Sequence, residues 1–232
     1  MKQKATKTFA LLLGMALLSL LNAPAYSQAE ATGTIGYLSI NGRLFDLSQY
    51  ADVVEGTPFL YKDWQKAMVQ MPNDGVINNT DIKLNLLDNE LYFKDPAGKE
   101  MIATDHIKAV TFNQGSALAI TFITKYALGN AAAGFPNGWY QLLQKGNAIL
   151  LKEHHKAMTT SKGYGTGPGE KVIETEYRYY VWYNGSFTRV KKLDEVAAAL
   201  GSAKLSQWMA GKKAASKAEK DMVDCVAYFN GQ

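Results

Sequence analysis

Short apolar runs alternate with turn-forming dipeptides through much of the chain. The turns contain Asn-Gly, Asp-Asn or Pro-Ala-Gly. Because asparagine and glycine readily adopt the positive φ angles at the tip of a tight hairpin, the pattern predicts antiparallel strands joined by hairpins. The predicted strands include IKLNLL (82–87), ELYFK (90–94), EMIAT (100–104), IKAVTF (107–112) and LAITFIT (118–124).

The segment YKDWQKAMVQM, residues 61–71, matches two periodicities. Trp64, Ala67 and Met71 recur at helical spacing. Strand alternation through the same segment fails only at Lys66. The sequence leaves this segment open between a short helix and a strand.

The pattern changes to helical spacing near the C-terminus. Three segments rich in alanine and leucine follow one another and are separated by glycines. Before the last of them, Ser216 and Glu219 have the spacing of a capping box, which predicts a helix start there. The predicted helices cover residues 193–200, 204–210 and 217–229.

These elements define a fold class. Strands do not alternate with long helices, so a parallel dinucleotide-binding sheet is disfavoured. The sequence predicts an α+β fold with two parts after the leader segment. An antiparallel β-meander occupies residues 30–192, and a C-terminal layer of short helices, residues 193–232, packs on it.

Residues 1–29 have the pattern of a secretory signal peptide. Three lysines precede the apolar run FALLLGMALLSLL (9–21), and small residues follow up to Ala29. The run is shorter than the roughly 20 residues that span a bilayer, which favours cleavage near Gln28 or Glu30 over a retained anchor. We therefore expect an exported protein, periplasmic or associated with the outer membrane, that spans no membrane after cleavage.

Cleavage would leave a nearly neutral chain. The chain has 25 basic and 21 acidic residues, but three lysines and no acids precede Glu30, which leaves 22 against 21. Because nucleic-acid binding needs a clustered excess of basic residues, we expect no nucleic-acid partner. The single cysteine, Cys225, can form no intrachain disulfide and lies on the apolar stripe of a predicted helix, so we expect it to be buried.

Several blocks of the chain share their order with a known family. They comprise a Gly-x-Pro-aromatic segment, a hairpin with a short Gly turn, a strand pair and a helix that closes on an aromatic-Asn pair. Over residues 56–231 the chain resembles a family of exported, uncharacterised proteins of Gram-negative bacteria. The resemblance implies export and this order of elements, and it implies no particular activity. The blocks are GTPFLYKDWQKAMV, DIKLNLLDNELYFKDPAGKEMIATDHIKAVTF, GWYQLLQKGNAILLKEHHKA, YRYYVWYNGSFTRVKK and VDCVAYFNG.

The aromatic run YRYYVWY, residues 177–183, is the main candidate for a binding surface. On a strand, alternate residues share a face. The face expected to pack on the core contains Ile173, Thr175, Tyr177, Tyr179, Val181 and Tyr183. The opposite face combines carboxylates, a guanidinium and two rings, as sugar-binding or peptide-binding surfaces do. It contains Glu174, Glu176, Arg178, Tyr180 and Trp182.

Two other interpretations apply to this strand. The favoured one places Tyr180 and Trp182 beneath the C-terminal helices, with the charged groups in solvent. In the other, Glu174 and Glu176 act as a general acid and base, since residues i and i+2 lie about 6–7 Å apart along a strand. Two carboxylates that project in parallel from one strand do not flank a scissile bond, so this is disfavoured. No hydrolase motif is present, and no catalytic residue is predicted.

Glu153, His154 and His155 are possible metal ligands because imidazole and carboxylate groups bind zinc. On a strand, however, His154 would point away from the other two. His106 is the only other histidine in the chain. Since a catalytic metal site uses at least three protein ligands, no metal is predicted.

The glycine-rich segment KGYGTGPGEK, residues 162–171, invites comparison with a phosphate-binding loop. In such a loop the lysine follows a glycine and precedes a hydroxyl residue. Here Glu170 precedes Lys171, and Val172 takes the hydroxyl position. The segment is therefore predicted to be a long connection between two strands, and no cofactor is predicted.

Together these features predict an exported cell-envelope protein that is a non-enzymatic binding or structural module, with an envelope protein or a glycan as its partner. The alternative is a carbohydrate-binding protein or an envelope hydrolase. That alternative uses the face formed by Glu174, Glu176, Arg178, Tyr180 and Trp182.

Overall fold

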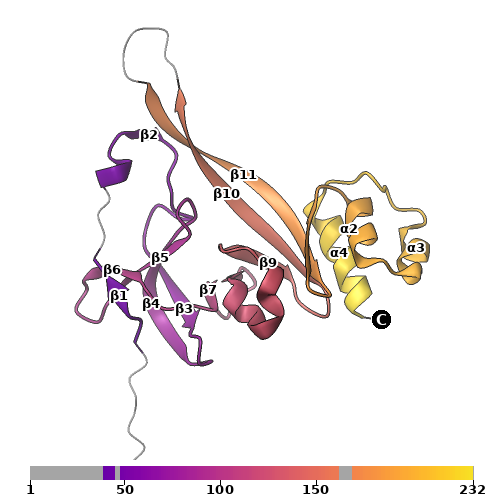
Figure 1. Ribbon diagram of the computed structural model, residues 1–232, viewed down its shortest axis with the longest axis horizontal. Helices are drawn as coiled ribbons and strands as arrows, with labels where there is room; N and C mark the ends of the chain where they lie inside the picture. Colours follow the sequence, from indigo (N-terminus) through magenta and orange to yellow (C-terminus); the bar gives the residue numbers. More distant parts are fainter. Residues whose placement is uncertain (1–38, 45–47, 162–168, 232) are drawn as a thin grey trace, which may run out of the picture. The chain divides into compact units, whose positions relative to one another are not determined.

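The computed structural model describes residues 39–44, 48–161 and 169–231 (Figure 1). The predicted signal peptide and residues 162–168 of the glycine-rich segment lie outside the described residues. Strands make up most of the described chain, and three short helices form its C-terminal part. The α+β class is therefore confirmed.

The described strands form a single sheet, in which only β2 and β11 pair in parallel. Consecutive strands are neighbours from β3 to β6 and again from β7 to β12, and the two runs join where β7 pairs with β3. One continuous meander is therefore not confirmed. The strands are β1 (Gly42–Arg43), β2 (Val53–Glu55), β3 (Gln65–Gln70), β4 (Val76–Asn85), β5 (Glu90–Lys94), β6 (Glu100–Ala103), β7 (Ala109–Phe112), β8 (Ile120–Ile123), β9 (Tyr140–Gln144), β10 (Ile149–Ser161), β11 (Glu170–Tyr183) and β12 (Ser186–Val190).

The ambiguous segment 61–71 contains strand β3. Its buried side chains are Ala67, Val69 and Met71, which alternate as the inward face of a strand must. Lys66 is one of the even-numbered residues, which point away from this core face. The charge at Lys66 therefore does not interrupt the apolar pattern of the core face. These three side chains pack in the main core with residues of β4, β7 and β8.

The helices are α2 (Leu193–Leu200), α3 (Ala203–Met209) and α4 (Glu219–Asn230), close to their predicted positions. The predicted capping box is wrong. Helix α4 begins after Ala218, and the hydroxyl of Ser216 accepts a hydrogen bond from the Ala218 N–H and donates one to Asp221. Glu219 instead contacts β10. None of the helices in the described part of the chain has the length and apolar character needed to cross a membrane.

The helices pack on the C-terminal end of the sheet. Their apolar faces share a core with β9, β10, β11 and β12, and Cys225 is buried in this core. Burial raises the pKa of the Cys225 thiol to about 11. At the end of α4, the Asn230 amide accepts a hydrogen bond from the Ala148 N–H at 2.8 Å and donates one to the Ala148 carbonyl at 2.9 Å. This side chain ties the last helix to the turn before β10.

A segment that was not predicted, η3 (Lys125–Gly134), follows β8, and the short turn η2 (Ser48–Tyr50) precedes β2. Thr124 starts η3 because its hydroxyl accepts a hydrogen bond from the Tyr126 N–H at 3.2 Å. After η3 the chain passes through Phe135, which is buried against the sheet. This segment therefore helps to cover the sheet face opposite the helices.

Candidate functional site

The longest hairpin of the sheet positions the residues predicted to form a site. Strands β10 and β11 pair along their whole length and run side by side as a twisted ribbon between the C-terminal helices and β2 (Figure 1). We call this pair of strands the ribbon. Glu153 lies opposite Arg178, and His155 lies opposite Glu176. Opposite residues of an antiparallel pair share a face. Each predicted face of β11 therefore also includes side chains of β10.

The favoured sequence interpretation placed Tyr180 and Trp182 beneath the C-terminal helices. The helices instead cover the other face of β11. Tyr179, Val181 and Tyr183 pack with the helices. Trp182 is only 6% exposed and packs against Phe135, with ring centroids 5.5 Å apart. The interpretation that placed Trp182 beneath the helices is therefore wrong, because η3 and β12 supply a second apolar layer that the sequence did not reveal.

Tyr180 belongs to this second layer. Its ring stacks on Phe187 of β12, with centroids 4.4 Å apart. Its hydroxyl donates a hydrogen bond to Glu153 at 2.8 Å. Burial and this contact raise the pKa of Tyr180 to about 12, so the phenol stays protonated at neutral pH. Both aromatic side chains of the predicted face are thus engaged in packing.

The charged residues of the same face form a network. Arg178 donates to Glu176 at 2.8 Å, and Arg189 of β12 donates to the same carboxylate at 3.1 Å. The hydrogen bond from Arg178 lowers the pKa of Glu176. Glu176 is therefore ionised and supplies no proton near neutral pH. The structure brings Arg189 and Glu153 to this face, and both were missed, although the two-residue turn at 184–185 sets the register that places Arg189 opposite Tyr180.

The structure places Glu174 next to this network. Its side chain is exposed, and no ion pair joins it to a described residue. Glu174 and Glu176 lie on the same side of one strand, as expected.

The histidines lie on different faces. His154 hydrogen-bonds Gln141 at 2.7 Å, whereas His155 contacts Glu153 at 3.3 Å. His106, which is distant from both in the sequence, stacks on Tyr126. In the described ranges no group of three or more potential metal ligands comes together.

A polar joint connects the ribbon to α4 on the helix side. Glu219 accepts hydrogen bonds from Lys152 at 2.8 Å and from Tyr179 at 2.9 Å. His154 lies beside this joint, with its ring 5.0 Å from that of Tyr177. Burial first, and then the nearby positive charge of Lys152, lower the pKa of His154 to about 4. His154 is therefore neutral at physiological pH.

The outer edge of β11 is paired at both ends and not between them. β2 pairs with Lys171 and Val172 at one end. β12 pairs with Tyr179 and the residues after it at the other end. Residues 174–178 pair only with β10 in the described part of the chain, whereas the Ile173 carbonyl lies against Gly56, which follows β2. We call residues 174–178 the open stretch of β11.

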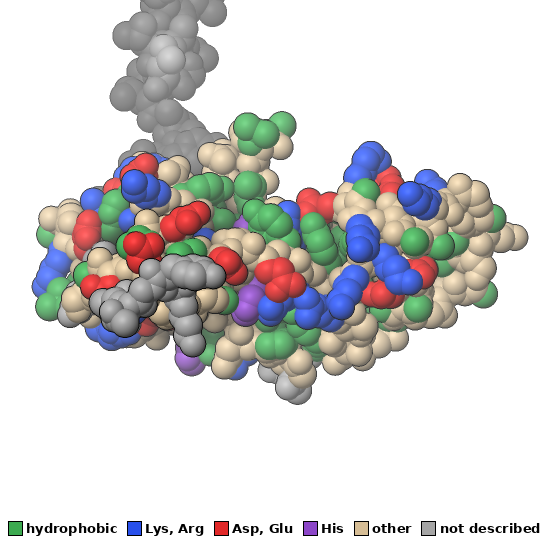
Figure 2. Space-filling view, turned by 90° about the horizontal axis from the view of Figure 1, so that it is seen from above, with side chains coloured by type: hydrophobic (Ala, Val, Ile, Leu, Met, Phe, Trp, Pro, Cys, Tyr) green, Lys and Arg blue, Asp and Glu red, His purple; other side chains and the backbone are tan. Residues whose placement is uncertain are grey.

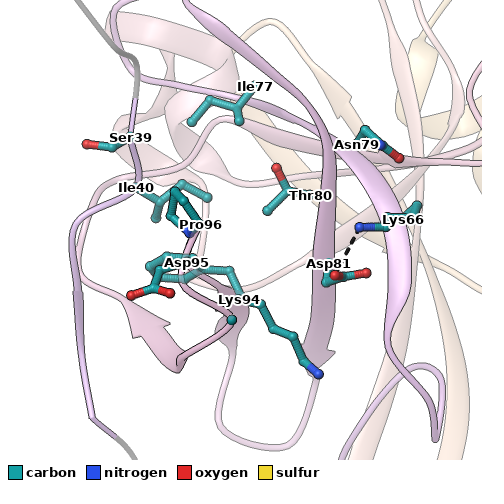
Figure 3. A pocket seen from close by; sticks show the side chains of 12 residues that line it. Ser39, Ile40, Lys66, Ile77, Asn79, Thr80, Asp81, Lys94, Asp95 and Pro96 are labelled. Atoms are coloured by element: carbon teal, nitrogen blue, oxygen red, sulfur yellow. Dashed lines mark hydrogen bonds and ion pairs between the residues drawn. The ribbon is translucent and has the colours of Figure 1, made fainter.

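Several cavities lie away from the ribbon, and two of them bear on ligand binding. One of about 430 Å³ is walled by Ile40, Ile77 and Pro96, with the Lys66–Asp81 ion pair at its rim (Figure 3). In the close-up, Lys94 extends away from these apolar walls. Most of the exposed lining area of this cavity is apolar. The charged side chains of the lining already have partners, since Lys66 pairs with Asp81, Lys94 pairs with Glu100, and Asp95 accepts hydrogen bonds from two backbone N–H groups. They are therefore poorly placed to orient a ligand.

The other cavity, of about 450 Å³, we call the Tyr126 pocket. It lies beside β6 and the start of η3 and is lined by more polar side chains, including Asn89, Thr104 and Asn137. His106 stacks on Tyr126 with centroids 4.4 Å apart. Such a mixture of amide, hydroxyl and ring groups suits a small polar ligand.

Comparison with known proteins does not extend this description. No family model, no curated protein and no solved structure matches the chain.

Proposed function

We propose that this protein is an exported, non-enzymatic binding module of the cell envelope and that it engages an envelope protein through the ribbon. The observation that supports this most strongly is the open stretch of β11, where Glu174, Thr175, Glu176 and Tyr177 are all exposed in succession. A strand exposed on both faces and along one edge is a surface on which another chain can pair. The half of β11 that follows, Tyr179 to Tyr183, is packed, so the exposed residues are held in place by a packed part of the same strand.

Apolar groups accompany the open stretch. Tyr177 is 55% exposed and Met158 is 37% exposed. Both lie on the helix-side face of the ribbon, because Tyr177 faces His154 and Met158 faces Ile173 in the same register. Val54 of the adjoining strand β2 is 60% exposed. Large apolar side chains left in solvent next to an unpaired strand edge are typical of an interaction surface.

Export is the second element of the proposal and rests on the leader-like pattern of residues 1–29. Mass spectrometry of the protein recovered from the periplasm or outer membrane should find a new N-terminus near Gln28 or Glu30. An intact Met1 on the exported protein contradicts this part of the proposal.

Site-specific photo-crosslinking in cells tests the binding surface. A photoreactive phenylalanine analogue in place of Tyr177 should give a discrete crosslinked product in the envelope fraction. The same analogue in place of Tyr228, a 39% exposed tyrosine on α4, is the matched control and should give none. Equal crosslinking from both positions, or none from Tyr177, contradicts the assignment of the ribbon.

A glycan is the second candidate ligand, and the Tyr126 pocket is the observation that favours it. The face first proposed for a glycan has its two rings, Tyr180 and Trp182, packed in an apolar layer. The hydrolase form of this alternative has less support, since Glu176 is held ionised. Binding on a glycan array that is lost in Asn137→Ala and kept in Tyr177→Ala would support a glycan in the pocket. No binding on the array, or binding unchanged in Asn137→Ala, would contradict a glycan ligand in this pocket.

A further inference from the structure

The open stretch of β11 is a gap between two paired segments on one side of a strand. β10 pairs with β11 throughout residues 170–182, so β2 and β12 both lie on the other side. Residues 174–178 extend over about 16 Å at roughly 3.3 Å per residue. In a strand, every second residue directs its N–H and C=O to the same side. This gap therefore presents main-chain donors and acceptors along a length that suits one short strand.

The open stretch lacks the devices by which proteins usually protect an edge. It contains no proline and pairs with β10 without a register shift. Its only protection is charge, from Glu174 and Glu176 on one face. Like charges opposite one another destabilise a strand pair, so these carboxylates discourage pairing with an acidic strand. A basic residue opposite Glu174 meets no such penalty, whereas one opposite Arg178 would meet a like charge.

The pairing of the carboxylates differs between the two ends of the gap. Glu174 and Glu55 form no ion pair with a described residue, whereas Glu176 is shared by Arg178 and Arg189. Unpaired carboxylates thus lie at the β2 end of the gap. In the view from above, acidic side chains are more frequent toward the β2 end of the ribbon and basic side chains gather over the C-terminal helices (Figure 2).

We propose that the open stretch of β11 binds an extended polypeptide segment that adds as a strand between β2 and β12, with a lysine or arginine beside Glu174 and apolar residues beside Tyr177. This inference rests on the proposed function and names the chemistry of its partner. The main chain supplies affinity in such strand addition, and the alternating side chains supply specificity. Here the basic residue would pair on one face, and the exposed Tyr177 ring would gain an apolar cross-strand neighbour on the other.

A second copy of this chain does not fit the gap. Two β11 edges would meet in antiparallel orientation, with each copy carrying β2 and β12 on the same side of its own strand. The flanking strands of one copy would then occupy the space needed by β11 of the other. A register centred on Glu176 would also place the two Glu176 carboxylates opposite each other, which is unfavourable. A single extended segment avoids both conflicts.

Fluorescence anisotropy with defined peptides tests this inference. The probe is an acetylated, amidated and fluorescein-labelled peptide TKVTVTT, with a single lysine, and its matched control is TEVTVTT. The purified protein should bind the lysine peptide and not the glutamate peptide. Glu174→Lys should weaken binding of the lysine peptide about three- to tenfold and allow the glutamate peptide to bind. Glu100→Lys is the control, because β6 lies near the opposite end of the sheet.

A second pair of peptides tests the main-chain contacts. N-methylation of alternate residues of TKVTVTT removes either the N–H groups directed to β11 or those directed to solvent. One methylated peptide should lose binding by more than about tenfold, and the other should bind nearly as well as the parent. Equal loss in both peptides, or no effect of Glu174→Lys, overturns strand addition at this edge.

The outcomes separate this inference from the proposed function. If no peptide binds while the Tyr177 position still crosslinks in cells, strand addition is overturned and the ribbon remains a binding surface. If neither result appears, both the inference and the proposed function fail. Circular dichroism of Glu174→Lys checks that the exposed substitution leaves the fold unchanged.

Discussion

The two halves of β11 have the same partner strand and opposite environments. From Tyr179 to Tyr183 the strand has β12 at its outer edge, helices on one face and the Phe135 layer on the other. From Glu174 to Tyr177 both faces are exposed and the outer edge is open. Residue type does not explain the difference, since tyrosines occur in both halves. The environment is decided by which segments return to the strand.

This contrast gives the ribbon two roles. Its packed half is held by aromatic layers and by the Lys152–Glu219 contact with α4. Its open half is accessible and is supported only by β10 and by β2 at its end. An accessible strand held at both ends is suited to binding, because little order must be gained when a ligand pairs with it.

The largest effect is expected at the packed half. Trp182→Ala should lower the free energy of unfolding by about 3–5 kcal/mol, because it removes a buried indole from the layer formed with Phe135 and leaves a cavity. Urea denaturation followed by circular dichroism measures the change. A loss below about 1 kcal/mol would show that this half of the strand is not packed as described.

The next effect is expected where the open half of β11 meets β2. Gly56 has a φ of 84°, and a side chain there would collide with the Ile173 carbonyl. Gly56→Ala should therefore destabilise the protein by about 1–3 kcal/mol through backbone strain and displacement of β2. Thermal unfolding measures it, and Gly98→Ala, at a glycine of similar φ with open space around it, is the control. Equal effects at both glycines would argue against the β2 contact.

The third effect depends on pH. The pKa of His154 is lowered in the fold, so the unfolded chain binds more protons between the folded value of about 4 and the ordinary value near 6.5. The stabilisation is present above the ordinary value and is lost as pH falls through this window. We expect a loss of about 2 kcal/mol between pH 7.5 and pH 5 from this group. His154→Gln should flatten that part of the stability profile more than His155→Gln, which lies on the other face. Equal profiles for both variants would contradict the burial of His154.

The smallest effect is expected at the open half. Tyr177→Ala should change the free energy of unfolding by no more than about 1 kcal/mol, because the side chain is 55% exposed and its ring contacts His154 and the Lys152 ammonium at the surface. The same variant should reduce binding of the lysine peptide. Comparison of its denaturation midpoint with that of Trp182→Ala is the most direct test of the contrast within β11. A large loss of stability in Tyr177→Ala would show that the open stretch is covered.

Local patterns predicted the elements well where turns and periodicity agree. The hairpin turn at Asn184 and Gly185 has positive φ at both residues, 48° and 76°, as Asn-Gly predicts. The three helices also lie near their predicted positions. The capping box at Ser216 does not form because the Glu219 carboxylate instead accepts hydrogen bonds from Lys152 and Tyr179, which come from distant strands.

The candidate site was predicted in part. Alternation placed Glu174, Glu176, Arg178, Tyr180 and Trp182 on one face, and the register agrees. The favoured interpretation expected both rings to be packed, but beneath the helices, and Tyr177, which was assigned to the core face, is exposed. Alternation states which residues share a face, and it contains no information about what covers that face.

The sequence by itself determined the class of fold, the turns, the helical end and the alternation of β11, because these depend on short-range periodicity and on residues that favour positive φ. Only the tertiary structure decided which half of β11 is covered, which carboxylates are paired and where the strand edge stays open. Those properties depend on the adjoining strand β12 and on β2, η3 and α4, which reach β11 from distant parts of the chain. Contacts between segments far apart in the sequence leave no trace in local periodicity.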